Sequence, residues 1–244
     1  MDPLLISLAA FGLIAAGVLK GATGLGYSSC ALPFLAAALG LKTAIALVVI
    51  PAIASNLALL WTTGHFRETI ARFWPFYVST MPGIGIGLYA LVWLDPRHAE
   101  LMLGVLIVTY SIYSILRPPV ALPTQLQRPL QAPAGLLNGF FTGLTGSQVM
   151  PLLPYMLSLG LDRAQLVQAT NIAVTLASSC MAIGLLAFGL MSLPGLGISV
   201  LAIIPAMTGV IIGVRLRGLI PEGQFKTVVL IVLGLLGAGL IMRS

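Results

Sequence analysis

The sequence predicts an all-α integral membrane protein built from two repeats of inverted topology, each a re-entrant or broken helical hairpin followed by three transmembrane helices. Three observations carry this prediction. Hydrophobic residues make up 59% of the 244 residues and charged residues only 7%, whereas a soluble domain carries roughly 25% charged residues to cover its surface. Long apolar stretches recur from end to end, and a glycine-rich motif occurs twice. Lipid is therefore the expected solvent of this chain.

Charged residues and Pro/Gly clusters divide the chain into ten hydrophobic segments. The first, second, sixth and seventh are short, about fifteen residues or about 22 Å as helices, which is less than the ~30 Å of a hydrocarbon core. Two short segments joined by glycines are typical of a re-entrant or broken hairpin whose tip lies inside the protein. The ten segments are roughly 4–19, 27–41, 43–63, 74–94, 99–116, 134–146, 148–161, 164–188, 194–214 and 225–242.

Basic residues in the loops predict the orientation. If each short pair returns to its starting side, both termini lie on one side of the membrane, and most basic residues lie on the other. The positive-inside rule then places both termini outside the cytoplasm. The predicted inner residues are Arg67, Arg72, Arg117, Arg128, Arg163, Arg215, Arg217 and Lys226, and the outer ones are Lys42, Arg97 and Arg243.

The two halves of the chain share short matches in the same order. Thr23-Gly24 matches Thr142-Gly143, Pro33 matches Pro151, and Gly40-Leu41 matches Gly160-Leu161. We therefore divide the chain into a first repeat (1–117), a Pro-rich and polar cytoplasmic linker (118–133) and a second repeat (134–244). Three crossings per half invert the second repeat relative to the first. Inverted repeats with interrupted helices are typical of secondary transporters, which bind substrate where the interruptions meet.

Two glycine motifs carry a resemblance to a known family. They are Gly21-x-x-Gly24-x-Gly26 before Pro33 and Gly139-x-x-x-Gly143-x-x-Gly146 before Pro151. Over nearly its whole length the chain resembles the TauE/SafE family of sulfite exporter-like anion permeases. The resemblance implies a multi-pass protein of the bacterial inner membrane, with periplasmic termini, that exports sulfite, a sulfonate such as sulfoacetate, or another small anion.

The first hairpin tip, KGATGLGYSS at 20–29, offers an anion site. A helix that begins at Tyr27 presents free N–H groups and the positive end of its dipole, and glycines allow close approach to the backbone. A second helix N-terminus from the other hairpin would complete an oxyanion cage. Lys20 is expected to supply a full positive charge, the alternative being that its amine snorkels to the headgroups. The predicted substrate-binding residues are Lys20, Thr23, Gly24, Gly26, Tyr27, Ser28, Ser29, Gly143, Gly146, Ser147, Gln148 and Asn171, with Asn56 a weaker candidate.

Several functions are disfavoured by what the sequence lacks. Every Asp and Glu lies in a loop or at the end of a predicted span, which leaves no carboxylate relay for proton coupling in the core. An HExxH motif, an aspartate pair and a His/Cys cluster are all missing, so we predict no catalytic residue, metal or cofactor and disfavour an intramembrane enzyme. The expected partners are a small anion and the lipid bilayer, not nucleic acid. A homodimer is left open, as is a transporter or channel for another carboxylate, inorganic anion or zwitterion.

Overall fold

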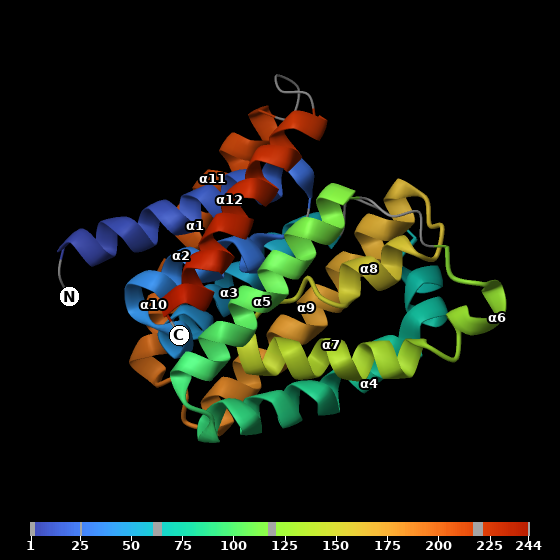
Figure 1. Ribbon diagram of the computed structural model, residues 1–244, viewed down its shortest axis with the longest axis horizontal. Helices are drawn as coiled ribbons and strands as arrows, with labels where there is room; N and C mark the ends of the chain where they lie inside the picture. The colour runs from blue at the N-terminus through green and yellow to red at the C-terminus, as the bar shows by residue number, and fades with distance from the viewer. Residues whose placement is uncertain (1–2, 25, 61–64, 117–120, 217–221, 244) are drawn as a thin grey trace.

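A computed structural model describes residues 3–24, 26–60, 65–116, 121–216 and 222–243. These residues form helices joined by turns, and no β-strand occurs among them (Figure 1). The prediction of an all-α membrane protein is confirmed. The first half of the chain contains α1 (Pro3–Thr23), α2 (Tyr27–Leu39), α3 (Leu41–Leu60), α4 (Phe66–Trp93) and α5 (Pro96–Leu116). The second half contains α6 (Thr124–Gln127), α7 (Gln131–Thr145), α8 (Leu152–Leu157), α9 (Arg163–Ala187), α10 (Leu193–Leu201), α11 (Ile203–Leu216) and α12 (Glu222–Arg243).

Four helical stretches in the described part of the chain are long and apolar enough to cross a membrane. They are Phe66–Trp93, Pro96–Leu116, Ala164–Ala187 and Leu193–Leu216. Large apolar side chains such as Trp93, Ile183 and Leu201 are exposed on the outer surface. In water such apolar faces would promote aggregation, whereas in a bilayer they contact lipid. A helix can lie in lipid because its backbone groups are hydrogen-bonded within the helix.

Close glycine contacts hold α1 against α11. Gly17 and Gly21 of α1 face Gly209 and Gly213 of α11, and a Cβ atom added to Gly21 would lie 2.2 Å from the carbonyl oxygen of Val210. No side chain fits at that separation. The two backbones are therefore in direct contact, as is typical of membrane helices that carry small residues four positions apart.

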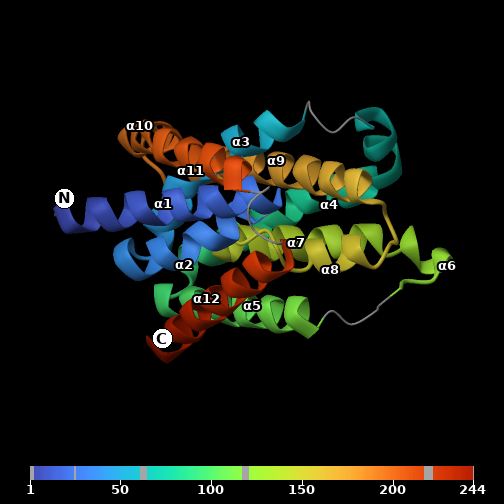
Figure 2. The same ribbon diagram turned by 90° about the horizontal axis from the view of Figure 1, so that it is seen from above.

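The contact between α4 and α7 repeats this arrangement, and the two helices lie side by side in Figures 1 and 2. Gly83 and Gly87 face Gly139 and Gly143. The first helix of each hairpin thus packs against a helix that follows the hairpin in the other half: α1 packs against α11, and α7 packs against α4. Two units related by a two-fold axis would make the same pair of contacts. In this packing Gly21 occupies the place of Gly143, whereas the sequence match pairs Gly24 with Gly143. The two registers therefore differ by about one helical turn.

The two hairpins enter from opposite ends of the molecule (Figure 2). Helix α1 starts at the end where the N-terminus lies, and α7 starts at the end where α6 lies. Both termini lie at one end, where Nη1 of Arg243 donates to the carbonyl oxygen of Ala37 at 3.3 Å. The two hairpins therefore have opposite orientations in the molecule.

Two predicted helices differ in the structure. The segment 148–161 contains only the six-residue α8, since 147–151 is not helical. Pro151 lacks an N–H group and disfavours a helical conformation in the residue before it. The segment 194–214 is divided into α10 and α11 near Ala202, because Pro205 cannot donate to the carbonyl of Leu201 and its ring crowds that group.

The predicted linker 118–133 is partly helical. It contains α6, and α7 already begins at Gln131. Some residues used to predict the orientation and the site lie outside the described part of the chain. They are Arg117 and Arg217, together with the side chains of Thr23, Arg163 and Lys226.

Candidate functional site

The first hairpin tip is a glycine turn that leads into a helix N-terminus. Gly24 and Gly26 have φ angles of 84° and 85°, a left-handed conformation that glycine adopts without steric cost. Helix α2 begins at Tyr27, as predicted, and the amide of Cys30 makes its first turn by donating to the carbonyl of Gly26 at 3.1 Å. The amides of Tyr27, Ser28 and Ser29 come before this first helical hydrogen bond, so they lie at the positive end of the helix dipole.

The second hairpin tip is a turn followed by extended chain. Helix α7 ends at Thr145, and Gly146 closes it with a φ angle of 74°. The hydroxyl of Thr142 donates to the carbonyl of Ser147 at 3.3 Å, and the amide of Ser147 donates to the hydroxyl of Thr145 at 3.2 Å. The predicted second helix N-terminus is therefore absent from this tip, which instead holds its chain by side-chain hydrogen bonds.

The two tips meet in the interior of the protein. The hydroxyl oxygens of Ser29 and Ser147 lie 3.3 Å apart, although the residues are far apart in sequence. A cavity of about 30 Å³ lies beside this contact, room for roughly two water molecules at ~10–15 Å³ each. A small ion suits this space. Its walls are formed by Lys20, Gly24, Gly26, Tyr27, Ser28, Ser29, Asn56, Gln148, Val149, Leu152, Leu153, Thr170, Asn171 and Val174.

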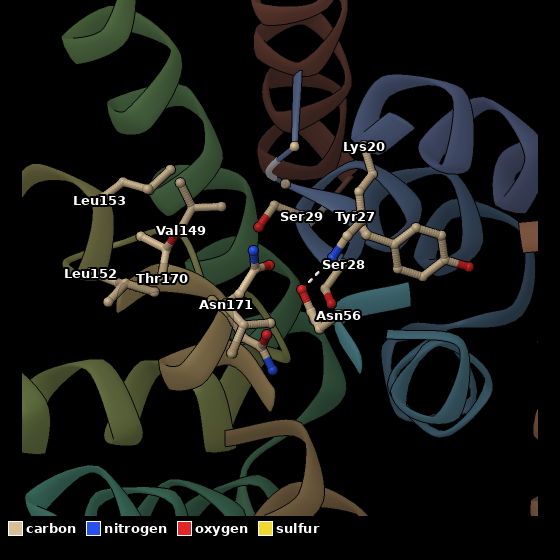
Figure 3. Close-up of a pocket in the computed structure, with 14 residues that line it drawn as sticks. Lys20, Tyr27, Ser28, Ser29, Asn56, Val149, Leu152, Leu153, Thr170 and Asn171 are labelled. Carbon is tan, nitrogen blue, oxygen red and sulfur yellow. Dashed lines mark hydrogen bonds between the residues drawn. The ribbon is translucent and has the colours of Figure 1, made fainter. Parts of the chain in front are cut away.

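Lys20 places its amine at this cavity (Figure 3). Its side chain is only 2% exposed, and its Nζ donates to Oδ1 of Asn56. Asn56 is held in turn by α3, since its Nδ2 donates to the carbonyl of Ala52 at 2.8 Å. A buried lysine that lines an internal cavity does not snorkel to a headgroup.

The charge of Lys20 has no carboxylate partner among the described residues. Asn56 is neutral, and the cavity lining contains neither Asp nor Glu. Burying an unpaired charge is costly in a protein interior and more so in a membrane. An anion in the cavity would balance this charge and also accept hydrogen bonds from the amides of the α2 N-terminus.

The second half of the chain contributes amide side chains to the same cavity. Nε2 of Gln148 donates to the hydroxyl of Ser178 at 2.9 Å, whereas Oε1 of Gln148 has no partner in the described part of the protein. Asn171 is 1% exposed, and its Nδ2 likewise has no partner there. Figure 3 shows the side chains of Asn171, Ser29 and Asn56 around one space. A bound anion would accept a hydrogen bond from the unpaired Nδ2 of Asn171.

Several predicted residues contribute less to the cavity than expected, or lie elsewhere. The ring of Tyr27 extends away from the cavity in Figure 3, and its hydroxyl has no partner among the described residues. Gly143 packs against α4, where an added Cβ would lie 2.4 Å from the carbonyl of Ile84. Gly146 and Ser147 support the tip and do not line the cavity. The side chain of Thr23 lies outside the described residues.

Sequence reasoning missed the apolar wall of the cavity, formed by Val149, Leu152, Leu153 and Val174. Apolar residues carry no signal that separates a cavity wall from ordinary packing. Thr170, which is not among the predicted site residues, also lines the cavity, and its hydroxyl donates to the carbonyl of Leu166 at 2.7 Å. Among the described residues, no group of three or more His, Cys, Asp or Glu side chains is placed to bind a metal ion.

Comparison with known proteins gives one match. The family model described as "Sulfite exporter TauE/SafE" matches residues 8–240. The matched region covers nearly the whole chain, including both hairpin tips and every residue of the cavity lining. Searches of curated proteins and of solved structures find no match.

Proposed function

The chain belongs to the TauE/SafE sulfite exporter family, a family of membrane transporters, and on this premise we propose that it exports a small sulfur-containing oxyanion as a secondary transporter. The proposed substrates are sulfite and organosulfonates such as sulfoacetate. We propose that the anion binds in the cavity between the two hairpin tips. The proposed ligands are Lys20, Asn56, the tip residues Gly24, Gly26, Ser28 and Ser29, and the side-chain N–H groups of Asn171 and of Gln148, whose Nε2 carries a second N–H besides the one donated to Ser178.

The observation that carries this proposal is the uncompensated charge of Lys20. The amine is buried beside the cavity, and its hydrogen-bond acceptor is the neutral amide of Asn56. A cation or a zwitterion with its ammonium group near Lys20 would add to the unpaired charge. A single anionic group would neutralise it, which favours an anion over an uncharged solute.

The donors around the cavity suit the oxygen atoms of such an anion. The amides at the start of α2, the hydroxyls of Ser28 and Ser29, and Nδ2 of Asn171 approach from different elements. Sulfite and sulfonates carry three oxygens on one sulfur atom, so three directions of donation can be used at once. A planar carboxylate has only two oxygens and would leave part of this set unused.

The direction of transport follows from the membrane potential in this proposal. An inside-negative potential favours the exit of an anion by about 2.3 kcal/mol per charge per 100 mV. We propose that the protein lies in the inner membrane with both termini in the periplasm, so that the loops rich in arginine face the cytoplasm. Each repeat, 1–117 and 134–244, would then contribute one hairpin to the cavity.

Counterflow in proteoliposomes tests this function. Vesicles that hold the purified protein are loaded with unlabelled sulfite and diluted into radiolabelled sulfite, and label uptake is followed with methanesulfonate, taurine, acetate and sulfate as competitors. We expect transient uptake by the wild type, strong inhibition by methanesulfonate and no uptake by Lys20→Met. Lys42→Met, which removes a lysine at the start of α3 outside the cavity lining, is expected to behave as the wild type. Linear, non-saturating flux would indicate a channel, and equal uptake by Lys20→Met would contradict the proposed site.

A further inference from the structure

One face of α7 carries a column of buried polar side chains. Gln131, Asn138, Thr142 and Thr145 are all buried. They are spaced by seven, four and three residues, the spacing that places side chains on a single helix face. The column therefore runs along nearly the whole of α7.

Asn138 is the least satisfied member of this column. It is 1% exposed, and neither Oδ1 nor Nδ2 has a hydrogen-bond partner in the described part of the chain. Gln131 is similar at one end, since its Nε2 donates to the carbonyl of Arg72 at 3.0 Å while its Oε1 is unpaired. An apolar residue of similar size at position 138 would avoid the cost of these buried, unpaired groups. A ligand that visits the column would pair them.

The inner end of the column is connected to the cavity. The hydroxyl of Thr142 donates to the carbonyl of Ser147, whose hydroxyl contacts that of Ser29 in the cavity wall. The outer end lies at Gln131, beside the backbone of the exposed Arg72, at the end of the molecule where α6 lies. Basic side chains at this end would attract anions.

The outer part of the equivalent face of α1 is apolar. Gly17 of α1 occupies the place of Gly139 of α7 in the two glycine contacts. Ala16 therefore corresponds to Asn138, and Lys20 corresponds to Thr142. Ala16 is fully buried, and Leu13, one turn earlier, is also buried. The outer part of the polar column, at Gln131 and Asn138, is thus a property of one repeat, and it reaches only one end of the molecule.

We propose that the transported anion reaches the cavity along this face of α7 from the α6 end, and that Asn138 is a transient binding residue on that route. The inference rests on the proposed function. In the described conformation Asn138 is buried, so passage requires the opening of this face, as alternating access between inverted repeats provides. With cytoplasmic arginines at the α6 end, the column is the cytoplasmic entry route of an exporter.

Two variants of Asn138 test the route by effects that a structural role would not produce. Asn138→Leu removes both unpaired groups and keeps the size of the side chain. We expect an unchanged or higher melting temperature, sulfite binding within threefold of the wild type, and counterflow at least tenfold slower. Asn138→Thr keeps a hydroxyl and is expected to retain more counterflow than Asn138→Leu. A lower melting temperature with normal counterflow per folded protein would assign Asn138 a structural role and overturn the proposal.

Thiol labelling tests the side of access. Asn138→Cys and Ala16→Cys are each made in a protein with Cys30→Ala and Cys180→Ala, and both are treated with 2-sulfonatoethyl methanethiosulfonate, which carries a sulfonate group. We expect labelling of Asn138→Cys from the α6 side, slowed by methanesulfonate, which does not react with the reagent, and little labelling of Ala16→Cys. The reverse pattern would overturn the route while leaving the cavity intact. Absence of sulfite binding by the wild type would overturn the proposed function and the route together.

Discussion

Replacing Lys20 by methionine is the perturbation that separates an anion site from a packing cluster. The substitution keeps an unbranched side chain of similar length and removes the charge. In the wild type, Nζ donates to Oδ1 of Asn56 and the amine lines the cavity. Binding of an anion should therefore be lost far more than folding.

The loss of affinity can be bounded from the position of the amine. Two unit charges about 4 Å apart interact by about 4 kcal/mol at an effective dielectric constant of 20, and a hydrogen bond to a charged group contributes about 1.5–3 kcal/mol net. These two contributions overlap, and desolvation of the anion offsets part of them. With a net loss of about 2–4 kcal/mol, Lys20→Met should bind sulfite or methanesulfonate roughly 30- to 900-fold more weakly.

Stability should change little by comparison. The variant leaves Oδ1 of Asn56 without its donor, at a cost of about 1–3 kcal/mol, but it also removes a buried charge that no carboxylate balances. These two effects oppose each other, so the melting temperature of the ligand-free protein should stay within a few degrees of that of the wild type.

Isothermal titration of purified protein with methanesulfonate measures this affinity, with Lys42→Met as the control for removal of a lysine. Because methanesulfonate is a monoanion throughout the neutral range, its charge does not change during the experiment. Binding by Lys20→Met within threefold of the wild type would refute the assignment of Lys20 as the site's cation, whatever the effect on stability.

Three further predictions follow from single contacts. Gly83→Ala should destabilise the protein by about 1–3 kcal/mol, because its Cβ would lie 2.3 Å from a backbone oxygen of α7. Gly85→Ala, with nothing within 4 Å of its Cβ, should stabilise the protein by roughly 0.5–1 kcal/mol. Equal shifts of the two melting temperatures would contradict the close contact. Ser29→Ala, which removes a hydroxyl of the cavity wall, and Ser147→Ala, which removes the hydroxyl that contacts it, should each weaken anion binding by about 1 kcal/mol, or about fivefold. The double variant should lose less than the sum of the two, because the hydroxyls lie 3.3 Å apart. Fully additive losses in titration would exclude that coupling. Tyr27→Phe removes a buried hydroxyl without a partner among the described residues and should raise the melting temperature with binding within twofold; weaker binding would show that the hydroxyl reaches the anion.

The first hairpin was predictable because its signals are local. A glycine cluster interrupts an apolar stretch, and the start of α2 at Tyr27 follows from the return of apolar residues after Gly26. The second hairpin carries similar glycines, yet Pro151 and its neighbours keep residues 147–151 out of a helix. A proline within an apolar run can cause only a bend, whereas Pro151 removes most of the expected helix.

The glycines show why the site itself was only partly predictable. Glycine serves two purposes that look alike in a sequence: it adopts positive φ angles, as Gly24 and Gly26 do, and it allows two helices to touch, as Gly143 does against α4. The pairing of Lys20 with Asn56 depends on how α1 and α3 pack across the bundle. No rule of sequence spacing reports that contact, and Asn56 therefore ranked below Asn171 in the sequence analysis.

The most direct test of the central claim is to locate a bound anion. Selenite has the charge and shape of sulfite and contributes an anomalous scattering signal, so crystals of the wild type grown with selenite would reveal its position. The account predicts an anomalous peak between Ser29 and Asn171, within hydrogen-bond distance of Nζ of Lys20, and no such peak in Lys20→Met. A peak confined to the arginine-rich end of the molecule, or one that persists at the cavity without Lys20, would contradict it.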